Sequence, residues 1–337
     1  MSGKIVTLGE ILIRFSKLNH NRLIQPGLFN GNYGGSEANV AVSLATLGDN
    51  VEYVSRIPNN VIGDAALMKL HEFNVNTNHV VRGGDRLGAY YFEESAALRS
   101  SRVVYDRQDS SFYTLEPGMI DWKDVFKDAE VFHCSGITCA ISKNAADATF
   151  EAVKFAKEMG LTISCDINYR KNLWQYGANA HDVLHDLIKN ADIIFGDQGE
   201  YRVATNNDGV HFRATGSNDN LDFKAYKEWL NLAHKQYPHC KTFIMALRNQ
   251  LGADHHTLTG LILQDGELYH TKIYDILSIV DPMGVGDAFC AGYLHARNVY
   301  DGEPQKCLNY SLAASALKNS IKGDFNLNTD EEIKSAM

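Results

Sequence analysis

The sequence of 337 residues lacks the features that identify several large classes of protein. No apolar run approaches the ~20 residues that a membrane-spanning helix needs. No Lys/Arg-rich run occurs and the net charge is −9, so a nucleic-acid partner is not expected. The six cysteines form no Cys-x-x-Cys pair, and the six prolines form no proline-rich linker. These absences indicate a globular protein without a membrane or nucleic-acid partner.

Two nucleotide-binding motifs and a metal cluster are missing as well. The chain has no Gly-x-x-x-x-Gly-Lys-Ser/Thr, which excludes a Walker-type site. Phe289 stands where a Gly-x-Gly-x-x-Gly motif would place its third glycine, which argues against a dinucleotide fingerprint. Asp254-His255-His256 looks like a metal cluster, but adjacent side chains point in different directions and no further ligands are spaced to complete it. We expect no metal there.

The composition that remains is ordinary for a globular protein, with 45% hydrophobic and 22% charged residues. Residues 1–10 lead directly into an apolar strand pattern and contain no signal-peptide core. The cysteines lie mostly in apolar settings, as small core residues do. We therefore expect a cytoplasmic location with reduced thiols.

The most informative stretch is Asp281 to Asp287, Asp-Pro-Met-Gly-Val-Gly-Asp. Gly284 and Gly286 lead into an apolar pattern of helical spacing, so accessible backbone amides meet a helix N-terminus, which favours an anion. A carboxylate in the same turn, Asp287, suits phosphoryl transfer: the amides hold the migrating charge and the carboxylate takes a proton from an attacking hydroxyl. The alternative is a glycine-rich turn whose acidic residue only stabilises the helix.

Short apolar runs typical of strands alternate with helical patterns along most of the chain. The expected strands are Ile5–Leu8, Val51–Ser55, Val131–Cys134, Thr162–Asp166, Ile193–Gly196 and Thr242–Leu247. One expected helix begins near Ala38, and the others cover Val61–Phe73, Asn144–Met159, His181–Lys189, Phe223–Gln236 and Gly286–Asn298. This alternation predicts a parallel sheet with helices on both faces and ligands at the carboxyl ends of its strands.

Some segments depart from this alternation. Residues 10–15 continue beyond the first strand, and Leu87–Phe92 with Ser101–Asp106 have the alternation and aromatic content of a hairpin. These strands lack crossover helices, so we expect a small separate sheet that covers the ligand edge of the larger one as a lid. The polar stretch Asn206–Asn220 is expected to be a mobile surface loop.

A second glycine-containing segment, Gly34-Gly35-Ser36-Glu37-Ala38-Asn39-Val40-Ala41, precedes an apolar helix. Glycines allow the backbone to approach a ligand, and the Asn39 amide can both donate to and accept from a sugar hydroxyl. Alternatively, Ser36 only caps the helix. Together with Asp281 to Asp287, the segment resembles the two signatures of the ribokinase-like (PfkB-type) carbohydrate kinases. The resemblance extends from Ile5 to about Asn326.

Finer motifs are similar to one subgroup, the 2-keto-3-deoxygluconate kinases. These motifs are Leu8 to Arg14, Val104-Tyr105-Asp106-Arg107, Asp166 to Trp174 and Gly323 to Asn326. The resemblance implies a sugar-acid substrate bound by Gly34, Asn39, Tyr90, Tyr105, Arg107, Asn168, Arg170 and Asp324. The planar guanidinium of an arginine can form two hydrogen bonds with a carboxylate. A kinase for a neutral sugar has less use for such an arginine in its pocket. We expect Arg107 on the lid and Arg170 on the rigid sheet edge; the alternative for both is an exposed position without function.

The family resemblance also implies ATP and Mg²⁺. An Asn-x-x-Glu element that orients waters on magnesium matches Asp197-Gln198-Gly199-Glu200, with Asp197 in place of asparagine, and both carboxylates can hold a hydrated Mg²⁺ through water. The implied nucleotide contacts are Asp197, Glu200, Arg248, Gly284 and Gly286. Further departures are Ala246, where the family usually has Thr, and Lys322, where the subgroup commonly has proline.

We therefore expect a single ribokinase-like domain over residues 1–337: a three-layer α/β/α fold with a mostly parallel sheet and a lid from about residues 10–33 and 86–112. The expected reaction is ATP-dependent phosphorylation of a primary hydroxyl of 2-keto-3-deoxygluconate. Asp287 would be the base, with Gly284, Val285 and Gly286 as the anion hole. Two alternatives remain: a kinase of a neutral ketose or nucleoside, of fructokinase or ribokinase type, and a catalytically silent sugar-binding protein on the same fold. The sequence leaves a homo-oligomer open.

Overall fold

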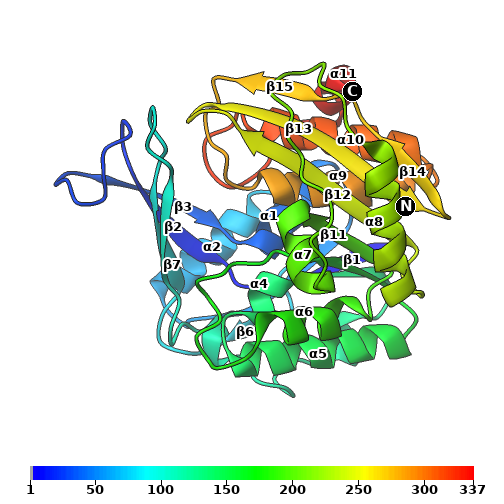
Figure 1. Cartoon of the computed structure of the whole chain (residues 1–337). Helices are drawn as coiled ribbons and strands as arrows, with labels where there is room; N and C mark the ends of the chain where they lie inside the picture. Colours follow the sequence, from blue (N-terminus) through cyan, green and yellow to red (C-terminus); the bar gives the residue numbers. More distant parts are fainter. Residues whose placement is uncertain (1–2) are drawn as a thin grey trace.

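The computed structural model describes residues 3–337, and its main body is a nine-stranded sheet between two layers of helices (Figure 1). The strand order is β14-β13-β12-β11-β10-β9-β1-β4, with β15 paired to β13. Neighbours from β4 to β12 are parallel, whereas β13 is antiparallel to β12, β14 and β15. The bounds are β1 (Lys4–Leu8), β4 (Val51–Val54), β9 (Ala129–Ser135), β10 (Thr162–Asp166), β11 (Ile193–Asp197), β12 (Thr242–Gln250), β13 (His255–Gln264), β14 (Glu267–His270) and β15 (Tyr274–Leu277).

Helices cover both faces of this sheet, and the buried side chains of each layer form one apolar cluster. One layer contains α1 (Ser36–Thr46), α2 (Val61–His71), α9 (Val285–Val299), α10 (Pro304–Lys318) and α11 (Asp330–Ala336). The other contains α3 (Trp122–Val125), α4 (Gly136–Cys139), α5 (Lys143–Glu158), α6 (Ala180–Ile188), α7 (Gln198–Thr205) and α8 (Phe223–Gln236), next to the short 3-10 helix η1 (Phe112–Thr114). Several helices begin where a polar side chain accepts from first-turn amides, such as Asn60 for α2, Ser142 for α5 and Asp222 for α8.

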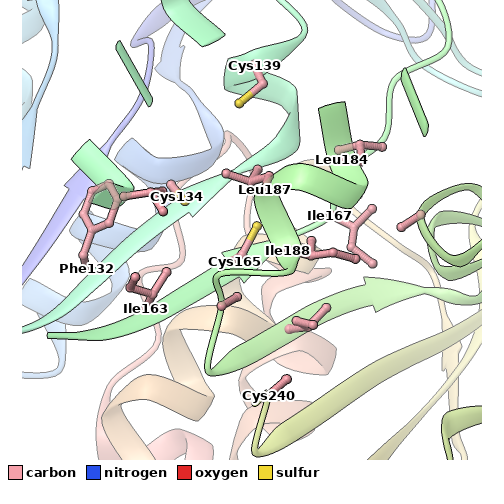
Figure 2. Packing of buried hydrophobic residues seen from close by; sticks show 14 of the residues in the cluster. Phe132, Cys134, Cys139, Ile163, Cys165, Ile167, Leu184, Leu187, Ile188 and Cys240 are labelled. Atoms are coloured by element: carbon pink, nitrogen blue, oxygen red, sulfur yellow. The ribbon is translucent and has the colours of Figure 1, made fainter. Parts of the chain in front are cut away.

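The close-up in Figure 2 shows how α6 packs on the sheet. Leu184, Leu187 and Ile188 of α6 lie against Cys165 at the end of β10 and Ile167 just beyond it, and all of these side chains are buried. All six cysteines are buried and free of disulfides. Dense packing of this kind holds the strands rigidly. The polar residues at the strand ends therefore have fixed positions.

A second sheet of four strands stands beside the main sheet, at the left of Figure 1. Its order is β3-β2-β7-β8, in which β7 and β8 form the expected antiparallel hairpin and β2 is parallel to β7. The bounds are β2 (Leu12–Lys17), β3 (Phe29–Gly34), β7 (Gly88–Glu93) and β8 (Arg102–Asp106). The short strands β5 (Arg56–Ile57) and β6 (Val81–Arg82) form a separate parallel pair.

The expected fold class, a mostly parallel sheet between helices with a smaller separate sheet, is confirmed. The sequence did not indicate α10, because its small and apolar residues are buried on most sides and leave no single apolar stripe. The expectation for residues 206–220 was incomplete: Phe212 and Ala214 are buried in the core, and Asn249 Nδ2 donates to the Ala214 carbonyl at 2.6 Å. Within residues 3–337, no helix is both long and apolar enough to cross a membrane.

Candidate active site

A cavity of about 570 Å³ lies where the carboxyl ends of the parallel strands face the small sheet. Of the residues that the sequence implicated, those lining it are Asn39, Tyr90, Tyr105, Arg107, Asn168, Arg170, Asp197, Glu200, Arg248, Gly284, Val285, Gly286, Asp287 and Asp324. Gly34 is the exception. Its backbone lies against Asp324, where an added Cβ would approach the carboxyl carbon to 2.5 Å, and the neighbouring Gly35 lines the cavity instead.

Asp287 lies in the first turn of α9, which begins after Gly284. Gly284 has a φ of 77°, and a Cβ there would lie 2.0 Å from the Asp324 carbonyl oxygen, so the position requires glycine. Asp287 Oδ1 accepts from Ser36 Oγ at 2.8 Å and Oδ2 accepts from Asn39 Nδ2 at 2.6 Å. Burial raises the pKa of Asp287 above the usual aspartate value, while both hydrogen bonds lower it. The carboxylate is thus held in place with its basicity increased.

The partners of Asp287 come from the N-terminus of α1. Gly35, not Ser36, is the N-cap residue of this helix, so the interpretation of Ser36 as a cap is wrong. The Ser36 hydroxyl donates to Asp287 and accepts from Asn168 Nδ2 at 2.9 Å, and Asn168 also donates to Asp166 Oδ2 at 2.8 Å. This chain of hydrogen bonds joins the loop after β10 to the start of α9.

The two arginines approach the cavity from different elements. Arg107 follows β8 and is 6% exposed; its Nε donates to Glu10 Oε2 at 2.6 Å, and its Nη1 has no hydrogen-bond partner among the described residues. Arg170 follows β10, and its side chain is 43% exposed. Arg170 Nη1 donates to Glu200 Oε1 at 3.1 Å and to the Tyr169 carbonyl at 2.9 Å. One guanidinium is therefore buried and fixed, and the other is accessible and held by a carboxylate.

Tyr90 and Asp324 form the wall between the small sheet and the C-terminal part of the chain. The Tyr90 hydroxyl donates to Asp324 Oδ1, and Arg14 Nε lies 3.2 Å from Asp324 Oδ2. Burial raises the pKa of Asp324 to about 6, although the Arg14 charge lowers it. The Tyr105 ring lies beside that of Tyr90, with centroids 6.2 Å apart. This wall offers a carboxylate and aromatic faces to a ligand.

Asp197 and Glu200 form a capping box at the start of α7. Asp197 Oδ1 accepts from the Glu200 amide, and Glu200 Oε2 accepts from the Asp197 amide, both at 2.8 Å. Burial and the neighbouring Asp197 raise the pKa of Glu200 to about 7. Within residues 3–337 no group of three or more His, Cys, Asp or Glu side chains is arranged to ligate a metal directly. Two cavity-lining carboxylates fit a cation that retains most of its waters, as Mg²⁺ does.

Sequence reasoning did not assign Glu37 or Asp166 to the site, although both line the cavity. Glu37 Oε1 accepts from Ser135 Oγ at 2.5 Å and from Thr138 Oγ1 at 2.6 Å, and burial raises its pKa to about 7. The available signal was a carboxylate in the first turn of an otherwise apolar helix. Such a residue is seldom buried without a partner.

A sequence profile described as "pfkB family carbohydrate kinase" matches residues 2–327. The chain belongs to this family. The 2-dehydro-3-deoxygalactonokinase of Haloferax volcanii is 29% identical over 99% of this chain and 96% of its own. The crystal structure of 2-dehydro-3-deoxygluconokinase from Thermotoga maritima is 33% identical, covers 99% of both chains and has a TM-score of 0.91. A putative ribokinase II from E. coli, in complex with ATP and Mg²⁺, is 22% identical over 99% of both chains, with a TM-score of 0.80, and shares the fold.

Membership of the PfkB family agrees with the geometry around Asp287. A carbohydrate kinase needs a base next to donors that hold a phosphoryl group. The start of α9 carries groups suited to both tasks, because Asp287 and the backbone amides after Gly284 lie in one turn beside the cavity. The family relationship therefore confirms the carbohydrate kinase expected from the sequence.

Proposed function

We propose that this PfkB-family kinase transfers phosphate from ATP to a primary hydroxyl of 2-keto-3-deoxygluconate. The observation that carries the proposal is Arg107, which is almost fully buried, lines the cavity and has an Nη1 without a hydrogen-bond partner within residues 3–337. A buried guanidinium nitrogen without an acceptor is costly. A sugar-acid carboxylate would supply the acceptor, and Glu10 already aligns the fork through Nε.

Arg170 gives the carboxylate a second partner. Its guanidinium is accessible from the cavity, and its hydrogen bonds among residues 3–337 go to Glu200 and to a backbone carbonyl, so it can turn toward a ligand. The names of the Haloferax and Thermotoga relatives support a keto-deoxy sugar acid as substrate. A neutral ketose or nucleoside would leave both arginines without a role. A silent sugar-binding protein would have no use for Asp287 beside a set of free amides.

In the proposed reaction Asp287 takes the proton of the attacking hydroxyl, and the amides from Gly284 to Asp287 hold the transferring phosphoryl group. Asp197 and Glu200 would hold Mg²⁺ through water, which neutralises phosphate charge when bound. Arg248 lies on the nucleotide side of the cavity in this proposal. The small sheet would act as a lid, and the free thiols suit a reducing cytoplasm.

A coupled assay of ADP release tests the proposal on four substrates: 2-keto-3-deoxygluconate, 2-keto-3-deoxygalactonate, fructose and ribose. Loss of a buried charge-assisted pair costs about 2–5 kcal/mol, so kcat/KM for the acids should exceed that for the neutral sugars by at least about 30-fold. Preference for the galactonate epimer would keep the substrate class and correct the stereochemistry. Equal turnover of fructose or ribose would refute the sugar-acid assignment.

A further inference from the structure

Lys318, the last residue of α10, is a fully buried lysine next to the start of α9. Its relative exposure is 0%, and its Nζ donates to the Ile321 carbonyl at 3.1 Å and to the Gly323 carbonyl at 2.9 Å. Lysines are almost never fully buried unless their charge is compensated. The proposed chemistry assigns no role to this residue.

Helix capping explains only part of this arrangement. A lysine at a helix C-terminus does interact favourably with the last carbonyls and the helix dipole. An exposed lysine achieves the same without desolvation, whereas burying an ammonium costs several kcal/mol. Burial lowers the pKa of Lys318 to about 8, and the carboxylates of Asp281 and Asp324 oppose that shift. Because desolvating the Lys318 ammonium is unfavourable, we expect this side chain to do more than end a helix.

The carbonyls that Lys318 binds belong to the loop packed against Gly284. Gly323 is held at both of its peptide groups: its N–H donates to Asp281 Oδ2 at 3.0 Å, and its carbonyl accepts from Lys318. The next carbonyl, that of Asp324, is the atom that a Cβ on Gly284 would approach to 2.0 Å. Lys318 therefore fixes the surface on which the N-cap residue of α9 rests.

The same ammonium balances the charge of the region. The buried cations Arg14 and Lys318 interact electrostatically with the buried carboxylates of Asp281 and Asp324. Arg14 binds Asp281 through two hydrogen bonds of 3.1 and 2.7 Å. Without Lys318, one buried negative charge would remain uncompensated next to the site where phosphate charge must accumulate. Asp287 also feels the Lys318 charge, which lowers the pKa of that carboxylate.

We propose that Lys318 is a positioning residue that serves as the internal cation of the anion hole. Its ammonium ties the Ile321 and Gly323 carbonyls to the back of the Gly284 turn and offsets the buried carboxylates, so that the α9 amides can accept phosphoryl charge. Lys318 touches neither substrate nor nucleotide in this assignment and acts through the loop. The inference rests on the proposed phosphoryl transfer at Asp287.

Two substitutions test the assignment, with Lys306→Met as the control because Lys306 lies exposed on the same helix. Lys318→Met keeps an unbranched side chain that is one atom shorter and removes its charge. We expect kcat to fall by about 10–100-fold, somewhat less than for loss of a direct oxyanion donor, with the KM for the sugar acid changed less than threefold. The acid limb of the kcat/KM profile should move to higher pH, because the pKa of Asp287 rises when a nearby positive charge is lost.

The pKa of Asp287, which determines this acid limb, also depends on the nearby charged groups Arg170, Asp166 and Glu37. It depends as well on the two hydrogen-bond donors Ser36 and Asn39. None of them is altered by Lys318→Met. A shift of the limb is therefore attributable to the ammonium. Near-normal kcat and an unshifted profile in a folded Lys318→Met variant would overturn the assignment.

Lys318→Ala provides a second measurement that does not require turnover. It leaves an ammonium-sized space lined by carbonyl oxygens, which ammonium chloride should refill while sodium chloride of equal ionic strength serves as control. We expect ammonium to raise both the unfolding temperature and the ATP affinity of Lys318→Ala, but not those of the native chain. No difference between the salts would overturn the proposal. Absence of turnover by the native chain on every sugar acid would count against the proposed function alone.

Discussion

Replacing Asp287 by asparagine isolates the basicity of this side chain from its shape. The carboxylate accepts from Ser36 Oγ and Asn39 Nδ2. The new amide can keep its oxygen toward Asn39 and donate its N–H to Ser36 Oγ, because a hydroxyl can turn and has two acceptor lone pairs. The hydrogen-bonded frame is thus retained, and only the ability to take a proton is lost.

The expected cost to catalysis follows from that loss. Removal of a general base lowers kcat by ~10²–10⁴-fold, which corresponds to about 3–5 kcal/mol of transition-state stabilisation. The substitution should not lower the stability of the folded state. Because burial raises the pKa of Asp287, the folded state binds its proton more tightly, and this residue reduces stability as pH rises through and above the unfolded value near 4. At pH 7 Asp287→Asn should therefore unfold at an equal or higher temperature than the native chain.

The assay is coupled ADP release at saturating 2-keto-3-deoxygluconate, with ATP binding and thermal unfolding measured on the same preparations. Asp265→Asn is the matched control, because Asp265 is exposed in the turn between β13 and β14. A folded Asp287→Asn variant that binds ATP normally and turns over within a factor of ten of the control would refute the assignment of Asp287 as base.

Three further outcomes are expected. Arg107→Lys should lower kcat/KM for the sugar acid by about 30-fold or more and change it little for a neutral sugar, because only the acid has a carboxylate for the guanidinium. The control Arg102→Lys, at an exposed position, should change kcat/KM for neither substrate. Equal losses on both substrates would make Arg107 a structural residue. Asn39→Ala removes a hydrogen-bond donor that favours ionised Asp287, so the pKa of that carboxyl should rise and the acid limb of the kcat/KM profile should move to higher pH. An unmoved limb would show that Asn39 does not influence the base. Arg14→Met should lower the free energy of unfolding in urea by about 3–5 kcal/mol, because Asp281 and Asp324 lose a buried partner. The control Arg86→Met, which removes an exposed ion pair, should lower it by less than about 1 kcal/mol. Similar small losses in both variants would contradict the buried network.

The parts of the site that the sequence predicted are those encoded locally. The turn at Gly284 and the first turn of α9 lie within one short segment, so backbone freedom, helix start and carboxylate were visible together. The hairpin of β7 and β8 was visible because alternation and aromatic content are also local signals. The order of strands and helices predicted the layered fold for the same reason.

The parts that the sequence could not predict depend on contacts between distant residues. Arg14 meets Asp281 across 267 positions, and Glu10 meets Arg107 across 97. No periodicity relates such pairs, because each partner satisfies the pattern of its own strand or loop. Lys318 ends a helix that is buried on most sides and has no single apolar stripe, so the sequence indicated neither the helix nor the buried charge.

The two arginines differ in how firmly the structure holds them. Arg107 directly follows β8 at the root of the small sheet, where it is buried and fixed by Glu10, whose other oxygen accepts from Ser110. The root itself is tightly packed, since a Cβ on Gly35 would lie 2.0 Å from the Glu10 carbonyl oxygen. Arg170 is the accessible side chain, and its partner Glu200 is the residue proposed to hold hydrated Mg²⁺. In the proposed function, a sugar-acid carboxylate would bind a preorganised Arg107 together with a more accessible Arg170. The same carboxylate would compete with Glu200 for the Arg170 guanidinium.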